Sequence, residues 1–187
     1  MIENFLRRPS GAAEIIADGV RVVGALSVLV AAIWWTGTDA GILALALPAL
    51  LVPRFVGVRP WFDITYGTAV LVASWSNVID LYRSVAGWDL VVHTVCTGLI
   101  AAIAYLALVR WGITPRPPDA RRAAVIFTAA LGLAASAVWE IIEWIGKTFV
   151  TDEIFVTYTD TIGDMAVGAL GSLAAGFLVA RVRLLRE

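Results

Sequence analysis

The chain has 187 residues, of which 60% are hydrophobic and 16% are charged, and its net charge is −1. A soluble domain is nearer a quarter charged, so the composition excludes a soluble protein and predicts one integral membrane domain over residues 1–187. The charge balance gives no sign of a nucleic-acid partner. The single cysteine, Cys96, excludes an intrachain disulfide or a cysteine-based zinc site.

Six apolar segments predict an all-α fold, a polytopic transmembrane helical bundle of about six spans. Each segment approaches the roughly 20 residues that a spanning helix needs. Residues 1–18 are expected to be a cytosolic or interfacial lead-in, and the second segment is expected to be kinked or re-entrant at Pro48 and Pro53. The segments are residues 20–36, 40–57, 64–82, 89–111, 122–146 and 160–182.

The distribution of lysine and arginine predicts the orientation of the bundle. If the N-terminus is cytosolic, 12 of the 14 cationic residues fall on the inner side, and only Arg83 and Lys147 fall outside. Because cytoplasmic loops carry an excess of Lys and Arg, both termini are expected in the cytosol.

Two glutamates interrupt the fifth segment, in the run Trp139-Glu140-Ile141-Ile142-Glu143-Trp144. A charge at the bilayer centre costs about 2.5–3.5 kcal/mol on insertion scales, and residues three apart lie on one helix face. An acidic face on an apolar helix therefore indicates a partner, a cavity or a function.

The predicted topology brings four more ionisable groups to the depth of these glutamates. The fourth segment begins outside at Asp89 and places His93 one turn deeper, and the sixth begins there with Asp160 and Asp164. At 1.5 Å per residue the glutamates lie roughly 5–9 Å from the outer end of their own segment. Small residues at four-residue spacing on the same faces predict close packing of the three helices.

Charge repulsion restricts what this cluster can be. Two carboxylates 5 Å apart repel by about 3 kcal/mol at an effective dielectric near 20, so some are protonated or a cation lies among them. Oxygen ligands with one imidazole suit a single divalent ion such as Mg, Mn, Ca, Fe or Zn. The candidate metal ligands are Asp89, His93, Glu140, Asp160 and Asp164, and the candidate catalytic residues are His93, Glu140 and Glu143.

Structural interpretations compete with this hypothesis. Asp89 and Asp160 are placed to cap the helices that they begin, and His93 is alternatively a hydrogen-bonded core histidine. Glu143 alternatively faces water at the interface, and Lys147 is either an interfacial anchor or the counter-charge of the cluster. Two further acids near helix ends are interpreted as structural: Asp63 and Asp80.

Three motifs, in order and spacing, resemble a known group of proteins. They are Trp88-Asp89-Leu-Val-Val-His93, the run 139–144, and Tyr158-Thr159-Asp160-Thr161-Ile-Gly-Asp164-Met followed by Gly171. Over roughly residues 60–180 the chain resembles the YjdF-like bacterial inner-membrane proteins of unknown function. Over residues 88–176 it is more distantly similar to the VanZ-like family.

The VanZ-like pattern is Asp-x3-His, then Glu-x2-Gln, then Asp-x3-Asn-x2-Gly. Glu143 stands where that pattern has Gln, and Gly168 stands where both patterns tend to have Asn, so a role for the Asn does not transfer. The resemblance implies the bacterial cytoplasmic (inner) membrane and the cell envelope, and it brings no accepted reaction. The shared positions are Asp89, His93, Glu140, Glu143 and Asp164.

Together these observations lead us to expect a metal-dependent enzyme whose site opens to the outer face and acts on a lipid or lipid-linked envelope substrate. One alternative is a proton-coupled transporter or flippase, which would need polar groups through the whole membrane depth, whereas the inner halves of the last three segments are nearly all apolar. The other is a non-catalytic envelope binding or scaffold protein, which has no use for Glu140 at that depth. The substrate, the metal and the oligomeric state are left open.

The topology predicts which loops face outward. A cysteine placed in residues 36–40 or 147–158 should react with a membrane-impermeant reagent added from the outer face, because the cationic residues lie on the other side. Labelling of either loop only from the cytosolic side would overturn both the topology and the placement of the site.

Overall fold

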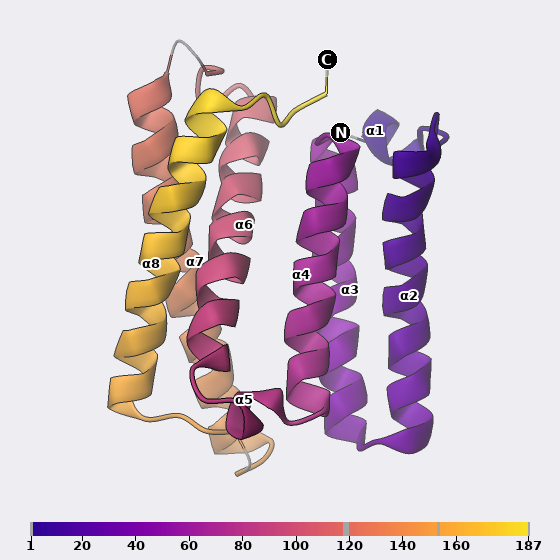
Figure 1. Cartoon of the computed structure of the whole chain (residues 1–187), viewed down its shortest axis with the longest axis vertical. Coiled ribbons are helices and arrows are strands. Elements are labelled where there is room, and N and C mark those ends of the chain that lie inside the picture. Colours follow the sequence, from indigo (N-terminus) through magenta and orange to yellow (C-terminus); the bar gives the residue numbers. More distant parts are fainter. Residues whose placement is uncertain (1, 118–119, 153, 187) are drawn as a thin grey trace. The chain divides into compact units, whose positions relative to one another are not determined.

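The computed structural model describes residues 2–117, 120–152 and 154–186, and within these ranges it is all-helical apart from one isolated bridge (Figure 1). The all-α prediction is confirmed. The helices of the described ranges are α1 (Ile2–Leu6), α2 (Ala12–Trp34), α3 (Gly37–Val56), α4 (Pro60–Val78), α5 (Leu81–Ser84), α6 (Trp88–Arg110), α7 (Arg121–Phe149) and α8 (Tyr158–Arg181).

Among the described residues, five helices are long and apolar enough to cross a membrane, namely α2, α3, α6, α7 and α8. Helix α4 has 19 residues, which gives it a length of about 28 Å. It falls outside that set because polar residues such as Asp63 and Asn77 lower its hydrophobicity. The count of six spans and the orientation of the termini stay predictions.

The start of α2 and the continuity of α3 differ from what the sequence predicts. Helix α2 begins at Ala12, so the second half of the expected lead-in is helical, and its charged Glu14 is held by arginines described below. Helix α3 is continuous from Gly37 to Val56, so the chain does not fold back at its two prolines. A helix in lipid tolerates proline when neighbouring helices supply the lost backbone contacts.

The chain divides into two compact units, and the prediction of one domain stays a prediction. Unit 1 comprises the chain up to Trp88 together with the tail from Arg183, and unit 2 runs from Asp89 to Val182. In unit 1, α2, α3 and α4 lie side by side (Figure 1). Thr36 and Asp39 form a capping box at the start of α3, and Pro60 occupies the first turn of α4.

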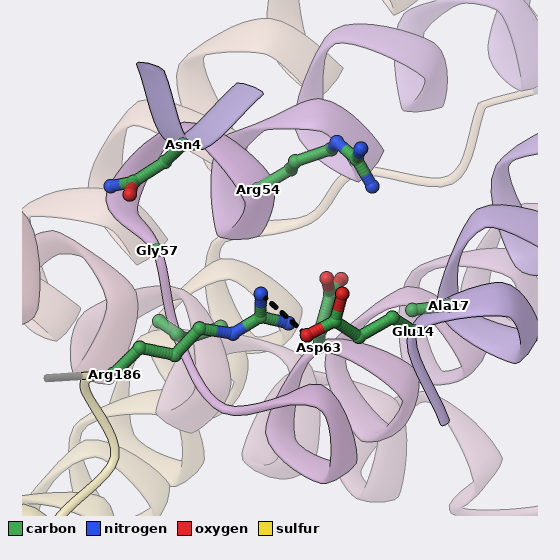
Figure 2. A pocket seen from close by; sticks show the side chains of 8 residues that line it. Asn4, Glu14, Ala17, Arg54, Gly57, Asp63 and Arg186 are labelled. Carbon is green, nitrogen blue, oxygen red and sulfur yellow. Dashed lines mark ion pairs between the residues drawn. The ribbon is translucent and has the colours of Figure 1, made fainter. Parts of the chain in front are cut away.

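One end of unit 1 holds a network of partly buried ion pairs around a hollow with room for about one water molecule (Figure 2). The Arg21 guanidinium donates to both oxygens of Asp63, at 2.7 and 2.8 Å. The Glu14 carboxylate pairs with Arg7 at 2.7 Å and with Arg186 of the tail at 2.9 Å. Asp63 is therefore structural, as its position near a helix end indicated.

In unit 2, glycines bring the backbones of α6, α7 and α8 close together. A Cβ on Gly171 of α8 would overlap the backbone carbonyl of Thr94 on α6, and a Cβ on Gly98 would lie 2.8 Å from the carbonyl oxygen of Gly171. Helices that approach this closely leave no room for side chains where they touch, which is the use of small residues at membrane helix interfaces.

The contacts between α7 and α8 define an antiparallel register. Gly176 lies against Thr128, Ser172 against Gly132, and Gly168 against Ser136. Each step of four residues along α7 is matched by four in the opposite direction along α8, so one glycine faces one hydroxyl at every level. The next level in this series places Glu140 opposite Asp164.

Two glycines of α8 provide a test of this packing. Gly171→Ala should destabilise the protein by about 2 kcal/mol or more, because the added Cβ forces backbone to move in a packed interface. Gly163→Ala is the matched control, since no atom lies within 4 Å of its Cβ, and it should be neutral or stabilising by about 0.5–1 kcal/mol. Melting temperatures in detergent measure both, and equal melting temperatures would contradict the close approach of α6 and α8.

Candidate metal centre

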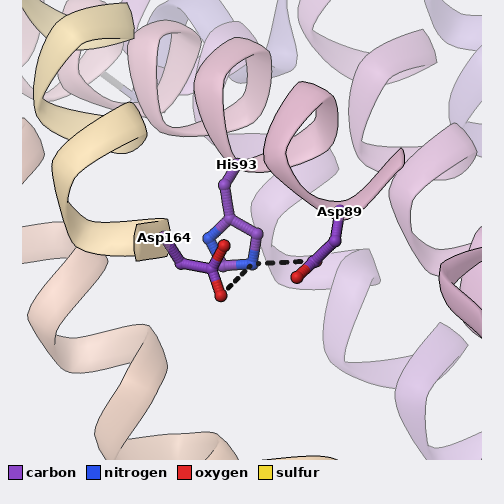
Figure 3. Close-up of side chains that lie close together, drawn as sticks. All are labelled: Asp89, His93 and Asp164. Atoms are coloured by element: carbon purple, nitrogen blue, oxygen red, sulfur yellow. Dashed lines mark ion pairs between the residues drawn. The ribbon is translucent and has the colours of Figure 1, made fainter. Parts of the chain in front are cut away.

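A histidine and two aspartates of unit 2 form the centre of the candidate site (Figure 3). Asp89 lies in the first turn of α6, and His93 follows one turn later on the same face. The Nε2 atom of His93 lies 3.4 Å from Oδ1 of Asp89 and 4.0 Å from Oδ2 of Asp164 on α8. One ligand atom from each of the three side chains lies within 4.8 Å of the others, which is compact enough to hold one ion.

The three side chains differ in their access to the surroundings. His93 is 8% exposed and Asp164 is 2% exposed, whereas the Asp89 side chain keeps 33% of its surface accessible. The group is therefore reached from the Asp89 side. Two carboxylates and one imidazole suit a hard or borderline divalent ion such as Mg, Mn, Fe or Zn.

Glu140 lies beside this group and outside it. It is 5% exposed, and no lysine or arginine forms an ion pair with its carboxylate among the described residues. The Thr161 side chain is its hydrogen-bonding neighbour, and His93, Asp160 and Asp89 are the charged groups that act on it. The structure thus brings Glu140 to the cluster, although not within 4.8 Å of all three members of the compact group.

Glu143 and Asp160 lie at the edge of the cluster, and both are half-buried. The Trp139 indole donates to Oε1 of Glu143 at 2.9 Å, one turn away on α7. The alternative interpretation that Asp160 caps its helix is wrong, because the cap of α8 is Thr157, whose hydroxyl accepts from the backbone N–H of Asp160. Asp89 likewise lies inside α6, after Trp88, rather than before its first turn.

Two features of the C-terminal end of α7 bear on the sequence interpretation. Lys147 donates to the backbone carbonyl of Ile154 at 2.9 Å, so it anchors the following loop. Helix α7 also continues to Phe149, which places Glu140 about 14 Å from the helix end instead of the expected 9 Å.

A set of hydroxyls is buried deeper in unit 2, on the faces whose small residues at four-residue spacing predict close packing of the helices. The hydroxyl oxygens of Ser136 and Thr128 have no hydrogen-bond partner among the described residues. The Ser172 hydroxyl donates to the backbone carbonyl of Gly168 at 2.8 Å. Their four-residue spacing, in line with Glu140 and Asp164, is the sequence signal that marks them.

A comparison with protein families covers this whole region. The family model described as "Predicted membrane protein (DUF2238)" matches residues 17–184. The chain belongs to the DUF2238 family. The match includes every candidate site residue, and the description of DUF2238 gives a membrane protein without a reaction. No curated protein and no solved structure matches the chain. The likeness to the YjdF-like and VanZ-like groups stays a prediction.

Removing the charge of Glu140 and removing that of Asp63 should have different effects on the melting temperature of this DUF2238 member. Glu140→Gln, measured in EDTA, should leave the melting temperature unchanged or raise it, because it replaces a buried carboxylate that no lysine or arginine pairs with among the described residues by a neutral amide. Asp63→Asn should cost about 3 kcal/mol, because Arg21 would lose its buried partner.

The measurement compares the melting temperatures of Glu140→Gln and Asp63→Asn with that of the unmodified protein in detergent. If Glu140→Gln lowered the melting temperature as much as Asp63→Asn, Glu140 would be a structural residue and not part of a site.

Proposed function

We propose that the protein is a membrane-embedded, metal-dependent enzyme of the bacterial cytoplasmic membrane that acts on a lipid or lipid-linked envelope substrate at the outer face. The observation that supports this most directly is the compact group of Asp89, His93 and Asp164. An imidazole buried between two carboxylates has little use in the packing of an apolar bundle, whereas it is a suitable set of metal ligands.

The roles of the residues follow from their positions. Asp89, His93 and Asp164 would hold the ion, and three protein ligands leave coordination positions for water and substrate. When bound, a divalent ion supplies Lewis-acid polarisation of a substrate oxygen. Glu143 would act as the general base, which is supported by its half-buried position at the rim and by the Trp139 indole that donates to it.

The surface around the cluster favours a substrate with acyl chains. Ile141 and Ile142, which follow Glu140, are 55% and 43% exposed. Val91 on α6 and Ile162 on α8 are also exposed. In a bilayer these apolar side chains contact lipid tails, so a lipid could present its polar headgroup to the cluster while its chains stay in the membrane.

A transporter or flippase that titrates these acids is the second candidate. It is favoured by the buried hydroxyls of Ser136 and Thr128, which continue the polar face of α7 below Glu140. Such a protein would use the acids as proton carriers and would need no metal. The first candidate is preferred because one ligand atom from each of Asp89, His93 and Asp164 lies within 4.8 Å of the others, which is the spacing that a single ion requires.

Removal of metal by a chelator distinguishes the metal-dependent enzyme from the transporter. An ion present at a hundred times its Kd stabilises the fold by about 2.7 kcal/mol, so EDTA should lower the melting temperature of the purified protein. His93→Ala should abolish this EDTA effect, because it removes the central ligand. Asp80→Asn should retain it, since Asp80 is an exposed acid of unit 1.

Elemental analysis accompanies the melting experiment. Absence of metal together with no EDTA shift would contradict the enzyme proposal. A melting temperature that then depends on pH and not on chelator would favour the transporter.

A further inference from the structure

An apolar groove runs along unit 1 between α2 and α4. Its volume is about 560 Å³, which lies within the range of about 300–1,000 Å³ for small-molecule sites. Among the described residues that line it, Thr68 and Trp75 carry the only polar side-chain groups, and the Trp75 indole already donates to the Ser27 hydroxyl at 2.9 Å. The groove therefore suits a hydrocarbon chain and offers a polar ligand almost no hydrogen bonds.

The groove is open because α2 has no side chain at Gly19. A Cβ added to this glycine would meet no atom within 4 Å, whereas Ile16 and Val23 on either side of it are 55% and 53% exposed. Val72 of α4 lines the groove as well and is 43% exposed. These apolar side chains leave a surface of unit 1 that no described residue covers.

The contacts between α2 and α4 show what lies beyond one end of the groove. A Cβ on Gly67 would lie 2.9 Å from Val20, and a Cβ on Gly24 would lie 3.5 Å from Leu71. The two helices are therefore parallel, and each residue of α2 is level with the residue of α4 that follows it by 47 positions, as 20 is with 67 and 24 with 71. This register places the start of α2 level with Arg59, the N-cap residue of α4.

The end of unit 1 at which α2 and α4 begin carries an excess of positive charge. Its described residues include seven arginines and four acids, whereas the opposite end has two acids and one arginine. Arg8 and Arg59 are exposed, and neither forms an ion pair with an acid among the described residues. The residues of the positive end are Arg7, Arg8, Arg21, Arg54, Arg59, Arg183 and Arg186 with Glu3, Glu14, Asp18 and Asp63, and those of the opposite end are Asp39, Asp80 and Arg83.

We propose that unit 1 binds one anionic glycerophospholipid, with an acyl chain in the groove and the phosphate at the arginine-rich end. Ile16, which lines the groove, lies about 6 Å from the start of α2, so a phosphate level with Arg59 is continuous with a chain in the groove. Arginines near a membrane surface attract anionic headgroups. This site belongs to unit 1 and is independent of the metal centre proposed for unit 2.

A second copy of the chain is the other candidate occupant, because membrane helices also associate through apolar surfaces. Two copies inserted in one bilayer share their orientation, so their arginine-rich ends would lie at the same depth and repel each other. An anionic lipid neutralises this charge instead. Charge complementarity therefore favours the lipid.

The test measures lipid binding to the delipidated full-length protein in detergent. Native mass spectrometry counts the molecules of dioleoyl phosphatidylglycerol or dioleoyl phosphatidylcholine that the protein retains at each lipid concentration. We expect one phosphatidylglycerol per chain, bound about tenfold more tightly than phosphatidylcholine, and a higher melting temperature in its presence. Gly19→Phe should abolish this binding, because the new ring fills the groove.

Gly41→Phe is the matched control for the groove. Gly41 of α3 also has no atom within 4 Å of its Cβ, and it lies outside the lining, so this variant should bind the lipid as the unmodified protein does. Arg8→Gln combined with Arg59→Gln should lower the affinity for phosphatidylglycerol to that for phosphatidylcholine. Gel filtration and the melting temperature without lipid establish that each variant is folded.

The remaining outcomes contradict the proposal. Equal binding of the two lipids, or a preference for phosphatidylglycerol that survives loss of both arginines, would overturn the role of charge. Phosphatidylglycerol retained by Gly19→Phe would place the lipid elsewhere on the protein. Absence of saturable lipid binding would overturn the site, and a dimer that Gly19→Phe dissociates would then assign the groove to a second copy.

Discussion

The close approach of the α8 backbone to α6 and α7 is the constraint on which the candidate site depends. Three glycine–hydroxyl contacts fix the register of α7 against α8, and Gly171 fits against the backbone of Thr94 on α6. Because lipid gives helices no hydrophobic reason to associate, such van der Waals contact is the main force that holds unit 2 together. Because the backbones are this close, the side chains on the facing surfaces contact one another. The same closeness brings Asp164 of α8 near His93 of α6.

The two units bury acids in different ways. In unit 1 each buried carboxylate has guanidinium partners, some from segments more than forty residues away in sequence, as Arg21 and Asp63 are. In unit 2, Glu140 and Asp164 are more deeply buried than Glu14, and no lysine or arginine forms an ion pair with them among the described residues. This difference is consistent with the proposed role of the second set as ligands.

The helices and the meeting of Asp89, His93 and Asp164 were predictable from sequence, because both follow from hydrophobic length and helical spacing. The hydrogen-bond partners of individual charged residues could not be predicted from the sequence. Thr157 takes the cap expected of Asp160, and Lys147 bonds to a loop carbonyl, and both depend on the path of the chain before α8. The extra length of α7 was also unpredictable, since Gly146 reads as a helix end and yet lies inside the helix.

The alternation of glycine and hydroxyl between α7 and α8 has a consequence for how this protein can change. If α8 slid by one turn, Ser172 would face Thr128 and Gly168 would face Gly132, so one level would be overfilled and another left hollow. The register is thus fixed by residues outside the compact group of Asp89, His93 and Asp164. Because other levels fix the register, substitutions at Glu140 and Asp164 should change the side chains there without moving the backbones of α7 and α8.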